Sequence, residues 1–308
     1  MIITVTMNTA VDKAYVIEEL KKGQVMRVKK CTNTPGGKGL NVARVIKCCG
    51  EESLATGFLG GHTGACIKDM LDAQQVQNDF SYTSSETRAC INILESDGTS
   101  TELLEPGEPL GQEDVAGFIS KFGKIIERCN VVTISGSVPE GVEIDIYEKL
   151  IGMAKARNKK VILDTSGMLL KEGIKAGPTM IKPNRDEIEA LLGIRINGRD
   201  EVIEGAKKIQ KMGIDLVAVS LGGDGALVVT KDAVFHGKPP KITTINTVGS
   251  GDSMVAAFAV GFERGYDITE MLRYAVAVSA ANTLTMTTGN FQMEDMERIY
   301  REVAVERL

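Results

Sequence analysis

The 308-residue sequence contains no tryptophan and only two histidines, His62 and His236. It also has no H-E-x-x-H or G-x-S-x-G motif and no cluster of histidines. A zinc hydrolase and a Ser-His-Asp esterase need those groups, so both classes are disfavoured. We expect catalysis by this chain to depend on carboxylates, backbone amides and cations, with both histidines in structural roles.

The six cysteines include one adjacent pair but no C-x-x-C motif, which argues against a zinc ribbon and a thioredoxin-type redox site. We expect free, mostly buried thiols. The N-terminus has no basic segment and reaches Asp12 before an apolar stretch of signal-peptide length develops. The longest apolar run, residues 254–262, is far shorter than the roughly 18 residues of a membrane span. These absences predict a reducing, cytoplasmic compartment.

Positive charge is also in the minority. Lys and Arg number 36 against 41 Asp and Glu, for a net charge of −5, and the basic residues are not clustered. This balance argues against a nucleic-acid-binding surface, so any anion that the protein binds must be held locally. The length fits one large domain, or a large domain with a small one.

Short β-branched segments alternate with stretches of helical periodicity along most of the chain. Strands are predicted at residues 2–6, 54–58, 131–135, 161–164, 179–182 and 216–220. Helices are predicted at residues 115–127, 146–156, 185–192, 202–212, 252–264 and 268–286. The alternation predicts an α/β fold in which a mostly parallel central sheet is covered by helices on both faces.

Two segments interrupt this alternation, at residues 15–31 and 88–105. The second resembles a β-hairpin with Asp97-Gly98 at its turn. We expect both to be insertions in a single domain of residues 1–308, forming a small β-sheet lid from residues 10–31 and 86–106. The alternative is that they are edge strands of the main sheet.

The sharpest local signal is Thr-Val-Gly-Ser-Gly-Asp-Ser at residues 247–253, which leads directly into a predicted helix. Small residues let backbone amides approach a ligand, and the helix dipole adds positive potential, so a phosphate would fit there. Asp252 either caps the helix or acts as a general base toward a hydroxyl group. The segment is not a dinucleotide fingerprint, because it lies near the C-terminus and not in a first βαβ unit.

A second glycine-rich segment, Pro-Gly-Gly-Lys-Gly-Leu-Asn at residues 35–41, also opens a helical stretch. It is not a P-loop, because Lys38 is followed by glycine and not by Ser or Thr. Its amides, together with Lys38 and Asn41, suit a polyhydroxylated or phosphorylated ligand. A plain loop-to-helix junction would explain the glycines but would give the two polar side chains no task.

Two further elements follow predicted strands. Ser-Leu-Gly-Gly-Asp-Gly-Ala at residues 220–226 lies where open α/β sheets bind ligands, so it either receives nucleotide phosphates or forms a tight hairpin. Asn184 and Glu187 follow the strand at 179–182. Their spacing fits a capping box and also fits a site for hydrated Mg²⁺.

These elements, in this order, resemble the PfkB family of carbohydrate kinases, which has the ribokinase-like fold. The resemblance covers nearly the whole chain and includes Asn8 and Asp12 near its start and Ser-Gly-Ser-x-Pro at residues 135–139. The Gly-Gly-Lys-Gly-x-Asn sequence and Glu-Thr-Arg at residues 86–88 are similar to the branch of 1-phosphofructokinase and tagatose-6-phosphate kinase. The implied fold has three α/β/α layers, a mostly parallel central sheet and a small β-sheet lid.

The resemblance assigns each motif a part of one active site. The base would be Asp252, and the transferring phosphoryl group would be held by the amides of Gly249, Ser250 and Gly251. The sugar would contact Asp12, Gly37 and Asn41, and the phosphate already on it would contact Lys38, Arg88 and Arg27. The ATP site would be lined by Lys182, Asn184, Ser220, Gly222 and Gly225, and Mg²⁺ would be held through water by Asn184 and Glu187.

The implied activity is that of a kinase that uses ATP and Mg²⁺ to convert a ketohexose phosphate into the bisphosphate. Fructose 1-phosphate and tagatose 6-phosphate are the leading substrates; the alternatives are fructose 6-phosphate and a sugar-phosphate sensor without turnover. An exposed edge of the lid predicts a homodimer. The sequence departs from the family at Thr9, where proline is common, which leaves the rigidity of that turn open.

Overall fold

The structure is a computed structural model that describes all of residues 1–308. Its central sheet has ten strands, in the order β14 (Ala304–Arg307), β13 (Val234–Lys238), β12 (Ala226–Val229), β11 (Leu216–Ser220), β10 (Met180–Ile181), β9 (Lys160–Asp164), β8 (Val131–Ser135), β1 (Ile2–Thr6), β4 (Ser53–Gly60) and β5 (Ser81–Thr83). The strands from β11 to β5 in this order run parallel, and the last three at the other edge are antiparallel.

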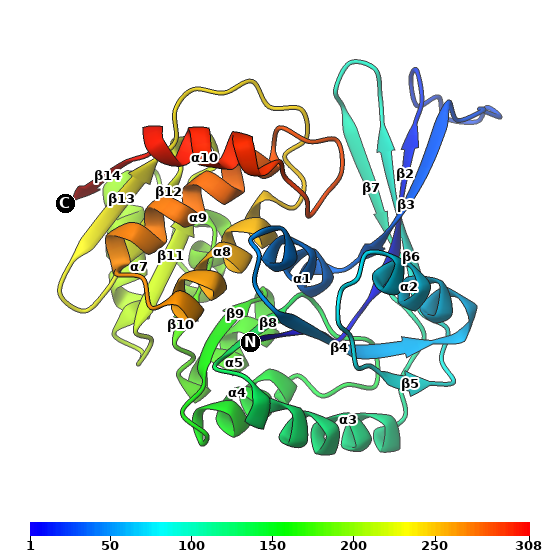
Figure 1. Cartoon of the computed structure of the whole chain (residues 1–308), viewed down its shortest axis with the longest axis horizontal. Coiled ribbons are helices and arrows are strands. Elements are labelled where there is room, and N and C mark those ends of the chain that lie inside the picture. The colour runs from blue at the N-terminus through cyan, green and yellow to red at the C-terminus, as the bar shows by residue number, and fades with distance from the viewer.

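Helices cover both faces of this sheet (Figure 1). One face packs against α3 (Gln112–Ile125), α4 (Ile146–Lys155), α5 (Gly167–Gly173), α6 (Arg185–Leu192) and α7 (Arg199–Gln210). The other packs against α1 (Lys38–Cys48), α8 (Ser250–Arg264), α9 (Ile268–Asn282) and α10 (Met293–Glu302). Neighbouring residues of β1 supply opposite cores, since Ile3 lies in the first and Ile2 in the second. The predicted three-layer α/β/α fold is confirmed.

The remaining helix, α2 (Gly61–Ala73), follows β4 and packs in a smaller cluster with Leu59 and Val11. It was not predicted, and neither were the last strands of the antiparallel edge. The predicted helix at 268–286 was too long, because α9 ends at Asn282. The carbonyl of Thr283 instead accepts hydrogen bonds from the amides of Ile245 and Asn246.

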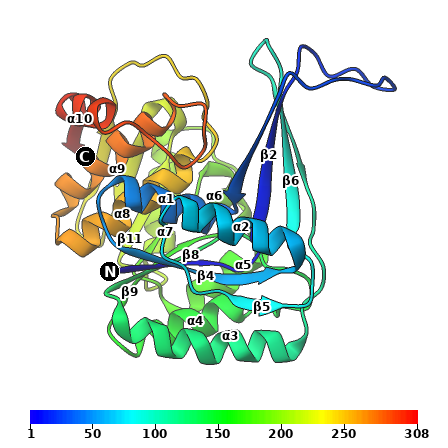
Figure 2. The same cartoon turned by 45° about the vertical axis from the view of Figure 1, so that its right-hand side comes forward.

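A separate four-stranded sheet, here called the small sheet, stands away from the main body (Figure 2). Its strands, in order, are β3 (Lys30–Gly36), β2 (Ala10–Val16), β6 (Arg88–Leu94) and β7 (Ser100–Leu104). The inner pair β2 and β6 is parallel, and β6 and β7 form the predicted hairpin. None of the four strands pairs with the central sheet. The first predicted lid segment, residues 10–31, ended too early, because the sheet continues to Gly36. That the small sheet acts as a lid stays a prediction.

None of the helices is long and apolar enough to span a bilayer. All six cysteines are free, as expected, but only half are buried: Cys49, Cys90 and Cys129.

Candidate active site

A cavity of about 680 Å³ lies between the small sheet and the carboxyl ends of the parallel strands. The small sheet contributes Asp12 and Arg88 to its lining. The strands β8 and β9 contribute their last residues, Ser135 and Asp164. The loop before α8 and the start of that helix form another side. Open α/β sheets place their ligand sites at this edge.

Asp252 lies in the first turn of α8 and is only 7% exposed. Its carboxylate makes no capping hydrogen bond, so the capping alternative is wrong. One oxygen instead accepts a hydrogen bond of 2.8 Å from the side-chain amide of Asn41 on α1. Burial raises the pKa of Asp252 to about 6, although the nearby charge of Lys38 acts in the opposite direction. The carboxyl group therefore exchanges its proton closer to neutral pH than an exposed aspartate does.

Asn41 is itself held in one orientation. Its carbonyl oxygen accepts a hydrogen bond of 2.9 Å from the guanidinium of Arg44, so its amide nitrogen must face Asp252. Arg44 is buried and also donates to the carbonyl of Thr288. The sequence did not single out Arg44, whose position within an apolar helical stretch gave no sign of a polar contact.

The start of α8 lines the cavity and includes backbone amides that have no partner within the chain. The amides of Gly249, Gly251 and Asp252 donate to no oxygen of the chain, whereas that of Ser250 donates to the carbonyl of Thr247 at 3.3 Å. Of the three amides expected to hold the phosphoryl group, that of Ser250 is the one with a partner within the chain. Gly249 has φ +78°, and a Cβ there would lie 2.4 Å from the Thr288 side chain. Glycine is thus required where the loop turns into the helix.

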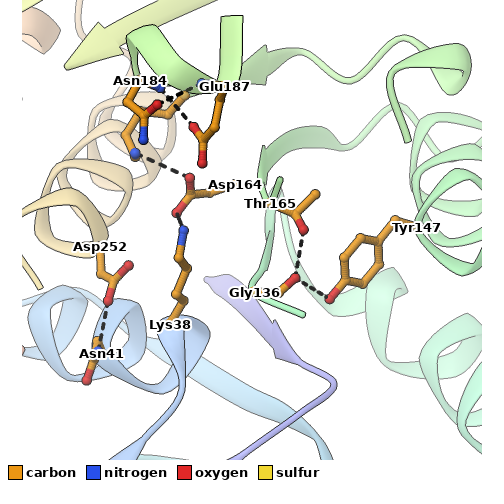
Figure 3. A network of polar contacts seen from close by, with 10 residues as sticks. Lys38, Asn41, Gly136, Tyr147, Asp164, Thr165, Asn184, Glu187 and Asp252 are labelled. Carbon is orange, nitrogen blue, oxygen red and sulfur yellow. Dashed lines mark hydrogen bonds and ion pairs between the residues drawn. The ribbon is translucent and has the colours of Figure 1, made fainter. Parts of the chain in front are cut away.

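Asp164, which the sequence did not single out, is the centre of the cavity's charge network (Figure 3). It is 1% exposed, and its two oxygens lie 3.3 Å from the ammonium groups of Lys38 and Lys182. Burial acts to raise the pKa of Asp164, but the two lysines outweigh it and lower that pKa. The same carboxylate raises the pKa of Lys38. The sequence did offer a signal for Asp164, because an acidic residue ends an apolar strand at the edge of the sheet where ligands bind.

The backbone around Asp164 is held by the motif at residues 135–139. The amide of Gly136 donates to the Asp164 carbonyl at 2.9 Å. The carbonyl of Gly136 accepts hydrogen bonds from the hydroxyl groups of Tyr147 and Thr165, at 3.0 and 2.8 Å (Figure 3). The neighbouring strands β8 and β9 are thereby tied together at the floor of the cavity.

The end of the cavity nearest the small sheet holds Asp12 and Arg88. A Cβ on Gly36 would lie 2.1 Å from the Asp12 carboxyl carbon, so this glycine makes room for the carboxylate. Burial raises the pKa of Asp12 to about 6, against the opposing charges of Arg44 and Arg88. The guanidinium of Arg88 donates to the carbonyls of Glu105 and Asn8, at 2.7 and 3.2 Å. Gly37 also lines this cavity.

The turn that precedes β2 is kept rigid by Thr9. Its hydroxyl group is buried and donates a hydrogen bond of 2.7 Å to the carbonyl of Phe58 on β4. This bond restrains the turn where a proline ring would otherwise do so.

A second cavity, of about 670 Å³, lies beyond the ends of β10 and β11. Asn184 and Ser220 line it, whereas Lys182 lines the first cavity. The turn at residues 222–224 joins β11 to the antiparallel β12 in a hairpin, and the same turn borders the cavity through Asp224. Gly222 and Gly225 both have positive φ in this turn.

Asn184 and Glu187 form the predicted capping box. Asn184 accepts a hydrogen bond from the amide of Glu187, and Glu187 accepts one from the amide of Asn184, both at 2.8 Å. Only one carboxyl oxygen of Glu187 is used, and the carboxylate faces the Asp164 side of the site (Figure 3). The chain contains no group of three His, Cys, Asp or Glu side chains able to hold a metal by themselves.

The structure does not bring every expected residue together. Arg27 is exposed in the loop between β2 and β3, forms no ion pair and does not line the cavity. His62 is exposed at the start of α2. His236 is buried in the second cavity, where its ring contacts the Asp224 carbonyl at 2.8 Å.

This chain is similar to known proteins over nearly its whole length. A model of the pfkB family carbohydrate kinases matches residues 4–295. Phosphofructokinase-2 from Escherichia coli in complex with potassium is 29% identical, covers 98% of each chain and gives a TM-score of 0.93. A possible 1-phosphofructokinase from Thermotoga maritima is 28% identical, with 100% of this chain and 99% of that chain covered and a TM-score of 0.91.

Ribokinase from Arabidopsis thaliana, complexed with ribose and ATP, is 22% identical and shares the fold, with a TM-score of 0.80 over 97% of this chain and 98% of that chain. The Escherichia coli enzyme is also known in complex with fructose 6-phosphate and as a tetrameric inhibited form. The ribokinase-like fold expected from the sequence is confirmed by these similarities.

Proposed function

This chain belongs to the pfkB family of carbohydrate kinases, and on that premise we propose that it phosphorylates a ketohexose phosphate to the bisphosphate. Membership makes it a phosphotransferase that uses ATP and an alcohol group as acceptor. The observation that carries the proposal is the buried carboxylate of Asp252, which does not cap its helix and lies beside free backbone amides. Cationic side chains line the same cavity.

Asp252 is the base in this proposal. One carboxylate oxygen accepts the proton of the sugar hydroxyl. The other oxygen accepts the hydrogen bond from Asn41, which fixes the orientation of the carboxylate. The amides of Gly249, Gly251 and Asp252 surround the phosphoryl group during transfer, where the positive end of the α8 dipole adds to their effect. Phosphoryl transfer needs mainly alignment and charge stabilisation, which these groups supply.

The two lysines that form ion pairs with Asp164 would offset the negative charge of the phosphate groups. Lys182 lies next to the amide cradle, since a Cβ on Gly251 would lie 3.4 Å from its ammonium nitrogen. We assign Lys182 to the ATP phosphates, with Asn184, Ser220, Gly222 and Gly225 toward the nucleotide. Asp164 holds both lysines in place through ion pairs while no ligand is bound.

Two cations remain for the phosphate already on the sugar. Lys38 and Arg88 line the same cavity as Asp12, Gly37 and Asn41, which we assign to the sugar hydroxyls. The planar guanidinium of Arg88 suits a phosphate held by two hydrogen bonds. Arg27 does not line this cavity, so we assign it to a sugar phosphate bound in the cavity of a second copy.

Mg²⁺ is the metal that the family implies, and the residues near the ATP phosphates fit it. The unused carboxyl oxygen of Glu187, with Asn184 beside it, offers a hard oxygen ligand. Mg²⁺ in kinases is usually held by one or two carboxylates together with phosphate oxygens and water, so no larger cluster of protein ligands is needed. The ion would neutralise charge on the ATP phosphates.

For the substrate we propose fructose 1-phosphate or tagatose 6-phosphate. Fructose 6-phosphate is the alternative, favoured by the similarity to an enzyme that binds it. We also propose a homodimer through the small sheet. Its edge strand β7 exposes Leu103 and Leu104, and Val25 in the β2–β3 loop is fully exposed. An exposed apolar edge is a template for pairing with a second chain.

The test is ATP-dependent turnover in Mg²⁺ buffer of fructose 1-phosphate, tagatose 6-phosphate, fructose 6-phosphate, free fructose and ribose, beside the Asp252→Asn variant. Selective turnover of one sugar phosphate that the variant lacks would support the proposal. Saturable binding of a sugar phosphate with no turnover of any of them would favour the sensor instead.

A further inference from the structure

The Glu-Thr-Arg sequence at residues 86–88 joins the small sheet to the main body, and only its arginine reaches the active site. The carboxylate of Glu86 accepts hydrogen bonds from the amides of His62 and Thr63, at 3.1 and 2.6 Å, in the first turn of α2. Helix α2 has no acidic residue in its first turn and no side-chain cap of its own. Glu86 therefore supplies the N-terminal cap of a helix from 23 residues farther along the chain.

The neighbouring contacts lock the same junction. Thr87 exchanges two hydrogen bonds with Gly60: its amide donates to the Gly60 carbonyl at 3.1 Å, and its hydroxyl accepts from the Gly60 amide at 2.8 Å. A Cβ on Gly60 would lie 2.0 Å from the carbonyl oxygen of Ser85, and one on Gly61 would lie 1.7 Å from Glu86. The two glycines thus leave space that residues 85–87 fill.

Arg88 follows directly and begins β6, where it pairs with Ala10 of β2. Its backbone is therefore held on one side by the junction with α2 and on the other by the small sheet. We propose that Glu86 is a positioning residue: by anchoring the small sheet to α2, it aims the Arg88 guanidinium at the phosphate carried by the substrate. This inference rests on the proposed function.

Loss of the Glu86 anchor should affect binding of the sugar phosphate and not of ATP, and within the sugar phosphate it should affect the phosphate group. Without the Glu86 anchor, the junction shifts. A displacement of about 1 Å at a binding group lowers the efficiency of a reaction by up to about 100-fold. We expect Glu86→Ala to raise KM for the sugar phosphate by about 10- to 100-fold, with KM for ATP unchanged. Preference for the phosphorylated over the free sugar should fall by the same factor. Glu86→Gln, which keeps the shape and one acceptor, should restore part of the loss.

The matched control is Asp267→Ala, which removes the side-chain cap of α9, an exposed hydrogen bond of 2.9 Å that the Asp267 carboxylate accepts from the amide of Glu270. It should lower the melting temperature to a similar extent without moving either KM. In an Arg88→Ala background, Glu86→Ala should cause no further rise in KM, because its effect passes through the arginine. Independent, multiplying effects of the two substitutions would overturn the proposal.

Hydrogen exchange tests the positioning role of Glu86 without a substrate. Glu86→Ala should speed exchange at the amides of His62 and Thr63 and along β6 and β7, whereas Asp267→Ala should leave these segments protected. Faster exchange confined to α2 would show a local cap and no anchor, and would refute the positioning role. A wild-type protein that binds no hexose phosphate would refute the proposed function, while the exchange result would still decide the role of Glu86 in holding the small sheet.

Discussion

Replacing Asp252 by asparagine removes a charge and leaves the shape of the side chain almost unchanged. The new carbonyl oxygen can still accept the hydrogen bond from Asn41, so the start of α8 should keep its structure. The variant loses its proton acceptor, and we expect kcat to fall by about 10² to 10⁴-fold, the usual contribution of a general base.

The same substitution should stabilise the fold at neutral pH. Burial raises the pKa of Asp252 from its ordinary value of 3.8 to about 6, so the native state binds more protons than the unfolded state between these values. Stability therefore falls as the pH rises from about 4 to about 6, and the charged carboxylate costs about 3 kcal/mol above that range. Asparagine avoids this cost, which in a chain of 308 residues corresponds to a melting temperature about 5 °C higher at pH 8.

Two assays test this reasoning together. Turnover of the preferred sugar phosphate is measured at saturating ATP, and thermal unfolding of both proteins is followed from pH 5 to pH 8. In the wild type, kcat/KM for the sugar phosphate should fall about tenfold per pH unit below pH 6, as the base of the free enzyme becomes protonated. A variant that keeps more than a tenth of the wild-type kcat, or that is less stable than the wild type at pH 8, would refute it.

Three other predictions follow from the described contacts. Asp164→Asn should lower the free energy of unfolding by about 3 to 5 kcal/mol in urea titrations, because it leaves the buried Lys182 ammonium without its partner; an unchanged midpoint would contradict this. Gly225→Ala should raise KM for ATP and lower the melting temperature, because φ is +84° and a Cβ would lie 2.0 Å from the Gly237 carbonyl; Gly223→Ala, which meets open space, is the control and should change neither. Light scattering at micromolar concentration should give the mass of a dimer, and a monomeric mass would exclude pairing through the small sheet.

Local signals in the sequence were sufficient for most of the fold. The strands at 2–6, 131–135 and 216–220 and the helix at 185–192 were predicted with their observed bounds, because each is a short periodic run ended by a turn residue. Helix α2 was missed because its residues contain few apolar side chains in helical spacing and its cap comes from Glu86, far along the chain. Such a helix start cannot be found from neighbouring residues.

The motif residues themselves, among them Lys38, Asn41, Arg88 and Asp252, could be named from the sequence, since their spacing next to glycines and helix starts reflects local backbone chemistry. Only the tertiary structure decided which alternatives held. It brings Asn41 within 2.8 Å of Asp252 across 211 residues, and it buries Asp164 between two lysines from separate motifs. Burial and long-range charge determine the pKa of each carboxylate, and both depend on elements that meet only when the chain is folded.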